Sequence, residues 1–350
     1  MLEVRDIAKS FKKPILKGVS FKVEKGEYFI ILGKSGIGKT VLLEIISGIL
    51  VPDAGKILLD GKDITRERIQ KRGVGLVYQD RALFPHLNVR ENIAYALRCR
   101  GVAESEIIDK VASVATDIGV SHLINQMPST LSFGESQRVA LSRTLISNPG
   151  CLLLDEPISA LDIQAKSEMR ALLRKLNYNG QTILHVTHDY EESIALANRV
   201  GVIEEGIISQ IGTPEEVFSK PCSAFVASFV GIRNVIKGQL HKDNGELGEF
   251  ICNGKKIFVL TEEKSGPGSL IFRSNDVTLS RKKKESSARN SYLGIVTDIE
   301  IARPGVEISI DIGFKISALL TKGSLKNLGL VLGCETWVEF KASAIKFIPG

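Results

Sequence analysis

The 350-residue sequence contains no apolar run near the roughly 20 residues that a membrane-spanning helix needs. Its most tempting stretch, "VLLEIISGIL", is interrupted by Glu44 and Ser47. The first residues, "MLEVRDIAKSFKK", alternate apolar and polar side chains and lack the apolar core of a secretory signal. We therefore expect a chain that does not cross a bilayer and that stays in the cytoplasm.

Cysteine is also scarce, and its spacing argues against a disulfide-stabilised protein. The 5 cysteines are scattered singly, with no CxxC pair, which argues against a disulfide framework and for reduced thiols.

The basic run "RKKK" at 281–284 is short and has no interleaved aromatic residues, and the net charge is only +6. We interpret this run as a solvated loop and expect no nucleic-acid partner.

The pattern of predicted secondary structure differs between two parts of the chain. Up to residue 232, short apolar strands alternate with amphipathic helices, as in a parallel sheet covered by helices. The segments "EYFIILG", "CLLLDEP" and "TILHVTHD" are apolar enough for strands buried on both faces. From residue 233 to 350 the segments are β-rich and punctuated by glycine. The sequence thus predicts an α/β domain over 1–232 and an all-β domain over 233–350.

A phosphate-binding loop is the strongest motif. "GKSGIGKT", from Gly33 to Thr40, fits GxxxxGK[ST] and lies between a buried strand and an apolar helix. Its glycines let backbone amides surround phosphates at a helix start. Lys39 is expected to reach the β- and γ-phosphates, and the Thr40 hydroxyl to bind Mg²⁺. The pattern predicts an ATP site with Mg²⁺ as its cofactor.

Two later strands end in polar residues at the same predicted sheet edge. Asp155 and Glu156 follow "LLL", and parallel topology directs them toward the phosphate loop. We expect Asp155 to support the metal and Glu156 to polarise the attacking water. His188, in "VTHD", is placed to contact the γ-phosphate, whereas His185 is interpreted as structural, and no metal site is expected from the two histidines.

In its motif order, the chain resembles the ATP-binding-cassette (ABC) ATPases over residues 1 to about 235. "VYQD" contains a glutamine, Gln79, similar to the Q-loop residue, and "LSFGESQRVALSRTL" resembles the signature motif. "SALD" resembles the loop that ends at Asp162, and Phe11 lies where the family stacks an aromatic ring on adenine. The resemblance implies catalytic roles for Lys39, Gln79, Glu156 and His188, and Mg²⁺ ligands at Thr40, Gln79 and Asp155. It implies these nucleotide-binding residues: Phe11, Gly33, Lys34, Ser35, Gly36, Ile37, Gly38, Lys39, Thr40, Ser132, Phe133, Gly134, Glu135 and Asp162.

The signature motif implies a homodimer. A helix N-terminus near Ser132, Gly134 and Glu135 offers amides and a hydroxyl to a γ-phosphate, and in the family that phosphate is bound by the opposite subunit. The sequence departs from the usual LSGGQ at Phe133, which replaces a glycine. We expect hydrolysis to survive this change; the Phe133 side chain either crowds the nucleotide or points away from it, and the sequence leaves its effect on the rate open.

The chain also resembles the separate ATPase subunit of an importer, because it has one cassette and no fused membrane segment. The stretch "QDRALFPHLNVRENI" matches the surface that receives a cytoplasmic helix of the permease, with contact candidates Leu83, Phe84, Pro85 and His86. An ordinary packed loop is the alternative. The resemblance implies integral-membrane permease subunits, an extracytoplasmic binding protein as an indirect partner, and a peripheral location on the cytoplasmic face of the membrane.

The last third resembles the small molybdate/tungstate-binding Mop module, over about 286–348, within a β-barrel of the OB-like, TOBE type. The matching stretches are "SSARNSYLGIVTDIE", "SALLTKGSLKNLGL" and "VEFKASAIKF". A buried tetrahedral dianion needs several short donors and a cation. The candidate oxyanion ligands are Ser287, Ala288, Arg289, Asn290, Thr321, Lys341, Ala342 and Ser343. The alternative is a dimerisation barrel in which "SARN" is a turn and "FKASA" an edge strand.

Together, these patterns predict a P-loop ATPase domain followed by a β-barrel regulatory domain. The favoured function is the ATPase of a molybdate/tungstate importer, with oxyanion binding to the barrel inhibiting transport when supply is adequate. A second interpretation keeps the importer and changes the cargo to sulfate, ferric iron, polyamine or sugar. A third is a soluble oxyanion-responsive or nucleic-acid-associated ATPase.

Overall fold

The computed structural model describes residues 1–350 except 81, 244, 284, 303 and 304. Lys284 of the basic run therefore lies outside the described residues. The chain divides into two compact units, Met1–Ser219 and Lys220–Gly350. The sequence places this boundary after residue 232. The structure divides earlier because α8 (Ala224–Phe229) packs on strands of the second unit, where Ala227 and Ile271 share a small apolar cluster.

The first unit contains a six-stranded sheet in the order β10-β9-β3-β8-β7-β6. All neighbours are parallel except β10, which is antiparallel to β9. The bounds are β3 Tyr28–Leu32, β6 Val74–Val77, β7 Cys151–Asp155, β8 Ile183–Thr187, β9 Arg199–Glu204 and β10 Ile207–Gly212. Every residue of β3, β7 and β8 is buried, which confirms the prediction of strands covered on both faces.

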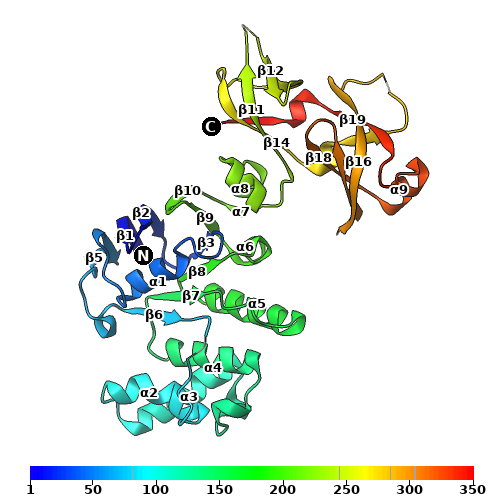
Figure 1. The fold of residues 1–350 in the computed structure, drawn as a ribbon. Coiled ribbons are helices and arrows are strands. Elements are labelled where there is room, and N and C mark those ends of the chain that lie inside the picture. Colours follow the sequence, from blue (N-terminus) through cyan, green and yellow to red (C-terminus); the bar gives the residue numbers. More distant parts are fainter. Residues whose placement is uncertain (81, 244, 284, 303–304) are drawn as a thin grey trace. The chain divides into compact units, whose positions relative to one another are not determined.

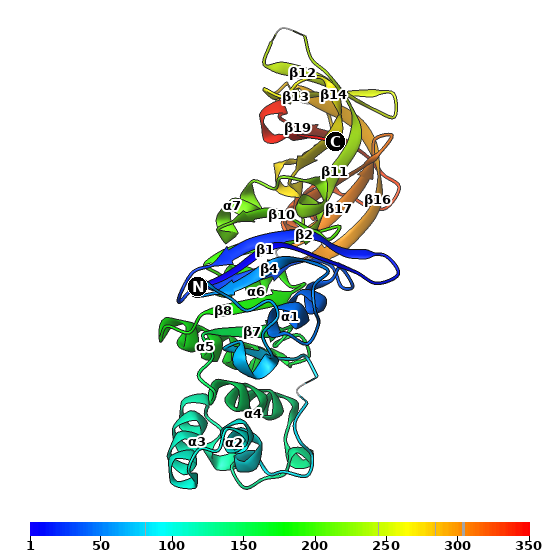
Figure 2. The same cartoon turned by 90° about the vertical axis from the view of Figure 1, so that its left-hand side faces the viewer.

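A second, antiparallel sheet in the order β2-β1-β4-β5 faces this one across α1 (Lys39–Ser47). Its bounds are β1 Leu2–Ser10, β2 Pro14–Val23, β4 Ala54–Leu59 and β5 Lys62–Asp63. Apolar side chains from β1, β2, β3, β4 and α1 form one continuous core, including Val4, Phe29, Leu42 and Ile57. Helix α1 is therefore packed between the two sheets, directly after the phosphate-loop segment (Figure 2).

Helices form the rest of the first unit. α2 (Val89–Cys99), α3 (Glu104–Ile118) and α4 (Phe133–Leu145) contact one another and make a helical segment beyond β6 (Figure 1). α5 (Ile163–Tyr178) and α6 (Tyr190–Leu196) pack together beside the parallel sheet, and α7 (Pro214–Ser219) contacts β9 and β10. Across the described residues we find no helix with the length and apolarity required to span a membrane.

The second unit is built from two five-stranded antiparallel sheets, β13-β12-β11-β14-β20 and β15-β19-β16-β17-β18. They share one apolar core, in which the rings of Phe272 and Phe340 stack at 4.8 Å. The short helix α9 (Lys322–Leu328) follows β18. The strand bounds are β11 Asn234–His241, β12 Leu247–Cys252, β13 Lys255–Leu260, β14 Gly266–Phe272, β15 Thr278–Ser280, β16 Asn290–Ala302, β17 Gly305–Asp311, β18 Lys315–Leu320, β19 Glu335–Phe340 and β20 Lys346–Pro349.

Candidate nucleotide and oxyanion sites

The phosphate loop runs from the end of β3 to the start of α1, as its motif predicts. Gly36 and Gly38 adopt left-handed φ angles of 79° and 106°, which glycine tolerates at little cost. A Cβ on Gly38 would also lie 2.6 Å from Cγ2 of Ile15. The first turn of α1 contains no acidic residue. No side chain caps its first amides either, so this helix start is suitable for an anion.

Lys39 borders this loop and is itself buried. Its Nζ donates hydrogen bonds to the carbonyls of Gly33, at 2.7 Å, and Lys34, at 3.0 Å, and lies 3.9 Å from Oε1 of Glu156. Burial lowers the pKa of Lys39, although the nearby carboxylates oppose that shift. The ammonium group is therefore already positioned at the loop, with donors that a phosphate can take over.

A pocket of about 680 Å³ lies in front of the loop. It collects residues from both sheets, from the phosphate loop and from the ends of β7 and β8. The lining residues are Phe11, Ile15, Ser35, Gly36, Gly38, Lys39, Thr40, Val41, Gln79, Asp155, Glu156 and His188. Of the predicted loop residues, Gly33, Lys34 and Ile37 are not among these; Ile37 packs against the apolar core instead. Ile15 and Val41 were not predicted, because neither belongs to the nucleotide-binding motif residues.

Asp155 and Thr40 meet inside this pocket. The Thr40 hydroxyl hydrogen-bonds to the Asp155 carboxylate, but burial dominates and raises the pKa of Asp155. A buried carboxylate beside a hydroxyl, with the Gln79 amide on the same pocket wall, offers the oxygen ligands that Mg²⁺ prefers. The donor set therefore fits Mg²⁺.

Glu156 has a strained backbone and two polar neighbours. Its φ is 44°, an uncommon value for a residue with a Cβ, and its amide donates to the Val186 carbonyl at 3.0 Å. Its Oε1 lies 2.8 Å from Nδ1 of His188. Such strain typically costs about 1 to 3 kcal/mol and is concentrated at functional sites. The turn after β7 thus aims this carboxylate at His188 and the pocket.

A buried polar cluster that the sequence did not reveal surrounds His185, three residues before His188. The Tyr28 hydroxyl is 3.1 Å from Nδ1 of His185, and Nε2 of His185 is 3.5 Å from Oε2 of Glu192. All three side chains are buried. Burial raises the pKa of Glu192 to about 7 and lowers that of His185 to about 3. His185 is thus a neutral core residue, as predicted, whose carboxyl neighbour titrates near neutral pH.

The signature residues line a second pocket, of about 470 Å³, in the first unit. Ser132 caps α4 by accepting from the Glu135 amide, while the Glu135 side chain accepts from the Ser132 amide at 2.8 Å. Asp162 caps α5 in the same way, through the Ala165 amide. Ser132, Phe133, Gly134, Glu135 and Asp162 therefore line one pocket, which is separate from that of Lys39.

The predicted permease-contact residues form a turn before α2. Pro85 and His86 are exposed, whereas Leu83 and Phe84 are half-buried. The Phe84 ring lies 4.4 Å from the Tyr95 ring, and Asn92 accepts from the Phe84 amide at 2.9 Å. The turn is consequently well fixed and still presents side chains to solvent.

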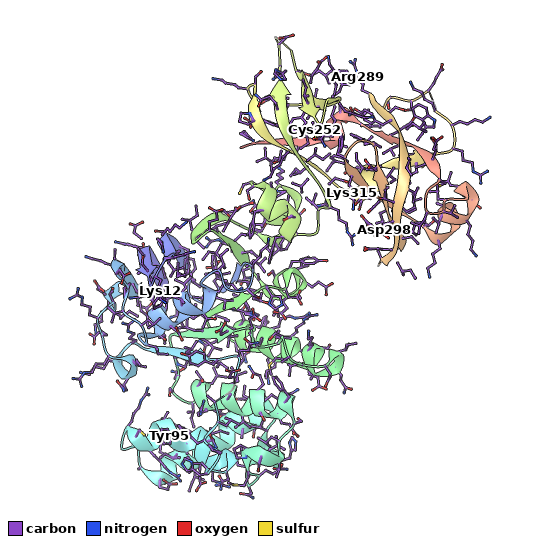
Figure 3. All side chains as sticks on the ribbon, in the orientation of Figure 1. Lys12, Tyr95, Cys252, Arg289, Asp298 and Lys315 are labelled. Atoms are coloured by element: carbon purple, nitrogen blue, oxygen red, sulfur yellow. The ribbon has the colours of Figure 1, made fainter. Side chains whose placement is uncertain are left out.

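In the second unit, a pocket of about 600 Å³ gathers most of the predicted oxyanion ligands. They come from the segment before β16 and the segment after β19, and Figure 3 labels Arg289 at the first of these. The lining residues are Glu246, Leu247, Leu260, Ser287, Arg289, Lys341, Ala342 and Ser343. Glu246, in the turn before β12, was missed because one acidic residue in a loop has no distinguishing pattern.

Three of the predicted oxyanion residues are placed differently. Ala288 is outside the pocket lining, and its amide donates to the Ser286 hydroxyl. The buried Asn290 side chain accepts from the Phe258 amide and donates to the Phe258 carbonyl, both at 2.8 Å. Thr321 caps α9 by accepting from the Ser324 amide at 3.0 Å. Asn290 and Thr321 thus have structural partners that account for their side chains.

Comparisons with known proteins agree with this geometry. The ABC transporter profile matches residues 16–159 and the TOBE domain profile matches residues 286–347. The chain is 44% identical to the molybdate/tungstate import ATP-binding protein of Pyrococcus abyssi, over 99% of each chain. It is 39% identical to the spermidine/putrescine import ATP-binding protein of Thermotoga maritima, over 86% of this chain and 83% of that one.

A solved structure is also similar. It is the dimeric post-hydrolysis state of the ATP-binding cassette MJ0796 with ADP and Pi, which covers 61% of this chain and 99% of its own. The TM-score is 0.56 and the sequence identity 28%. Full-length relatives, a matching cassette and the phosphate-loop pocket lead to one conclusion: the chain belongs to the ABC transporter family, as an import-type ATPase that carries a TOBE domain after its ATP-binding cassette.

Proposed function

We propose that this chain is the ATPase subunit of a molybdate/tungstate importer. The observation that carries the cargo assignment is the convergence of Arg289, Lys341, Ser287 and Ser343 on one pocket of the second unit. Two cations and two hydroxyls suit a tetrahedral dianion. The similarity to the Pyrococcus abyssi protein over the whole chain supports the same cargo.

Within this proposal, two chains close over two ATP molecules. The amides that begin α1, together with Lys39, bind the β- and γ-phosphates in one chain. Ser132 and Gly134 of the other chain approach the same γ-phosphate with the start of α4. Phe11, which is 60% exposed beside the pocket, is available to stack on adenine.

Hydrolysis needs a base and a way to neutralise charge. Glu156 orients the attacking water and accepts its proton, while His188 fixes the Glu156 carboxylate and faces the γ-phosphate. Thr40, Gln79 and Asp155 would hold Mg²⁺, which neutralises developing charge on the phosphate oxygens. Lys39 supplies a further positive charge that burial makes more effective.

The ATPase subunit acts at the cytoplasmic face of the membrane as a peripheral protein. Its Leu83–His86 turn receives a permease helix, and an extracytoplasmic oxyanion-binding protein delivers the cargo on the other side. Oxyanion bound to the second unit favours the separated state of the two cassettes and so slows uptake. Such feedback requires that the anion bind the two states with different affinity.

Calorimetry on the full chain tests the cargo assignment, with molybdate, tungstate and sulfate titrated in turn. The proposal predicts binding of the first two anions and not of sulfate. A second candidate cargo is a polyamine, which the Thermotoga maritima relative and the acidic Glu246 in the pocket favour. Heat released by spermidine, and not by molybdate or tungstate, would replace the oxyanion assignment with this one.

A further inference from the structure

Arg143 connects the signature helix to the turn at Ala82–Phe84. It lies near the C-terminal end of α4, the helix whose first turn carries the signature residues. Its Nη1 donates a hydrogen bond to the Ala82 carbonyl at 2.8 Å. Its guanidinium carbon is 5.2 Å from the centre of the Phe84 ring. One side chain thus contacts both a carbonyl and an aromatic ring of this turn.

The same turn is held from its other side by α2. The Phe84 ring packs on Tyr95, which Figure 3 labels on α2, and the fully buried Asn92 pairs with both the amide and the carbonyl of Phe84. Phe84 is therefore clamped between two helices. Because α2 and α4 also contact each other, a shift between these helices must change the clamp.

The backbone of this turn is not relaxed. Ala82 has a φ of 42°, a left-handed conformation that residues with a Cβ rarely adopt. A strained turn persists only where neighbouring contacts over-determine it. The hydrogen bond from Arg143 to the Ala82 carbonyl is one such contact, so the shape of the turn depends on where α4 lies.

Arginine suits this position better than lysine. Its planar group can donate in its plane while its face covers a ring, whereas an ammonium group is a compact point charge. Arg143 is also partly buried, and this burial lowers its pKa. Hydrogen bonds from a charged group are stronger where water is partly excluded.

We propose that Arg143 is a positioning residue that carries movement of the signature helix to the Ala82–Phe84 turn. One end of α4 engages the phosphate region of the dimer, and its other end holds the turn that presents Leu83–His86. Ser132 and Arg143 lie at opposite ends of the single helix α4. When ATP binding displaces Ser132, the helix also displaces Arg143, and Arg143 moves the turn. The engagement of Ser132 by ATP and the role of the turn as a permease contact both rest on the proposed function, whereas the contacts that Arg143 makes with Ala82 and Phe84 do not.

Hydrogen exchange on the full-length chain tests this link. The parent carries Glu156→Gln, so that added ATP with Mg²⁺ is retained. We expect ATP to change amide exchange about tenfold both at Ser132–Gln137 and at Ala82–His86, the size of effect that making or losing a charged hydrogen bond produces. Adding Arg143→Gln should abolish the change at Ala82–His86 and leave that at Ser132–Gln137. Arg143→Lys should restore part of the response.

The matched control is Arg98→Gln on α2, where the side chain is 42% exposed and pairs with Glu104. This variant should respond to ATP like the parent. A full response at Ala82–His86 in Arg143→Gln overturns the proposal, as does a parent in which ATP leaves that turn unchanged. If Arg143→Gln does not fold, Arg143→Lys decides: a response equal to that of arginine overturns the link. Because no permease or oxyanion is present, failure of the cargo assignment does not affect the result.

Discussion

Nδ1 of His188 and Oε1 of Glu156 lie 2.8 Å apart, within hydrogen-bonding distance, at the ends of two neighbouring parallel strands. Glu156 also lies 3.9 Å from the ammonium group of Lys39. The Glu156 carboxylate therefore lies within reach of both His188 and Lys39, the two residues that the proposed function places at the γ-phosphate. In that proposal, bound ATP would change the contacts among these three groups.

Replacing Glu156 by Gln should lower kcat at least about 100-fold, because a positioned general base typically contributes 10² to 10⁴ in rate. ATP binding should persist, since Lys39 and the loop are unchanged. The measurement is steady-state ATP hydrolysis alongside nucleotide binding. Glu205→Gln is the matched control, because Glu205 is an exposed glutamate with a similar φ of 48°. Equal losses in the two variants would show that the effect does not depend on the Glu156 carboxylate in the pocket.

Phe133→Gly should change kcat by less than about tenfold. The capping box between Ser132 and Glu135 shapes the start of α4 without using the Phe133 side chain. Glycine at a helical position costs about 1 kcal/mol relative to alanine, so Phe133→Ala is needed to separate lost ring from lost backbone order. ATPase rates of the three proteins measure the effect. A gain well above tenfold in both variants would mean that the ring obstructs the phosphate approach.

Glu192→Gln should alter how stability depends on pH. The pKa of Glu192 is about 7 in the folded chain against 4.5 for an ordinary glutamate. Between pH 4.5 and about pH 7 the folded state keeps a proton that the unfolded state has lost. The contribution of Glu192 to the free energy of unfolding is therefore complete below pH 4.5 and is lost as the pH rises to about 7. The total loss is roughly 3 kcal/mol.

Denaturant unfolding from pH 4.5 to 8 measures this effect as the difference between the variant and the unchanged chain. In Glu192→Gln the decline should be reduced by that amount, since glutamine does not titrate. The neighbouring Glu191→Gln is the control, because Glu191 is exposed. Identical pH profiles for Glu192→Gln and the unchanged chain would mean that Glu192 is already ionised at acidic pH.

Lys341→Met should weaken tungstate binding to the full chain at least about tenfold. A hydrogen bond from a charged donor contributes about 1.5 to 3 kcal/mol, and each 1.4 kcal/mol is tenfold in affinity. Titration calorimetry measures the change. Lys326→Met, an exposed lysine on α9, removes the same charge outside the pocket. Unaltered tungstate affinity in Lys341→Met would remove Lys341 from the site.

The sequence predicted the nucleotide pocket more fully than the oxyanion pocket, for a physical reason. Parallel strands bring their carboxyl ends to one edge, so Asp155, Glu156 and His188 could be placed together from strand order alone. In the second unit, contacts between two antiparallel sheets decide which loops meet. Glu246 precedes β12, which pairs with β13, and Phe258 of β13 is hydrogen-bonded by Asn290, next to the segment of Ser287; no local pattern encodes this contact between the sheets.

The buried partners were likewise not predictable. Glu192 lies beside His185 because α6 packs on the parallel sheet, and the sequence shows only an acidic residue early in a helix. The sequence predicts Thr321 as a candidate oxyanion ligand, yet its side chain caps α9. A threonine before a helix has a local use that competes with any ligand role.

The side chain of Asn290 imitates a peptide group, pairing with the amide and carbonyl of Phe258 as a further strand would. Asn290 belongs to one of the two sheets of its unit and Phe258 to the other, so this pair of hydrogen bonds connects the two sheets. Its sequence neighbour Arg289 lines the pocket. A ligand that displaced Arg289 would therefore displace Asn290 as well, and through the Asn290–Phe258 pair it would act on both sheets of the unit together.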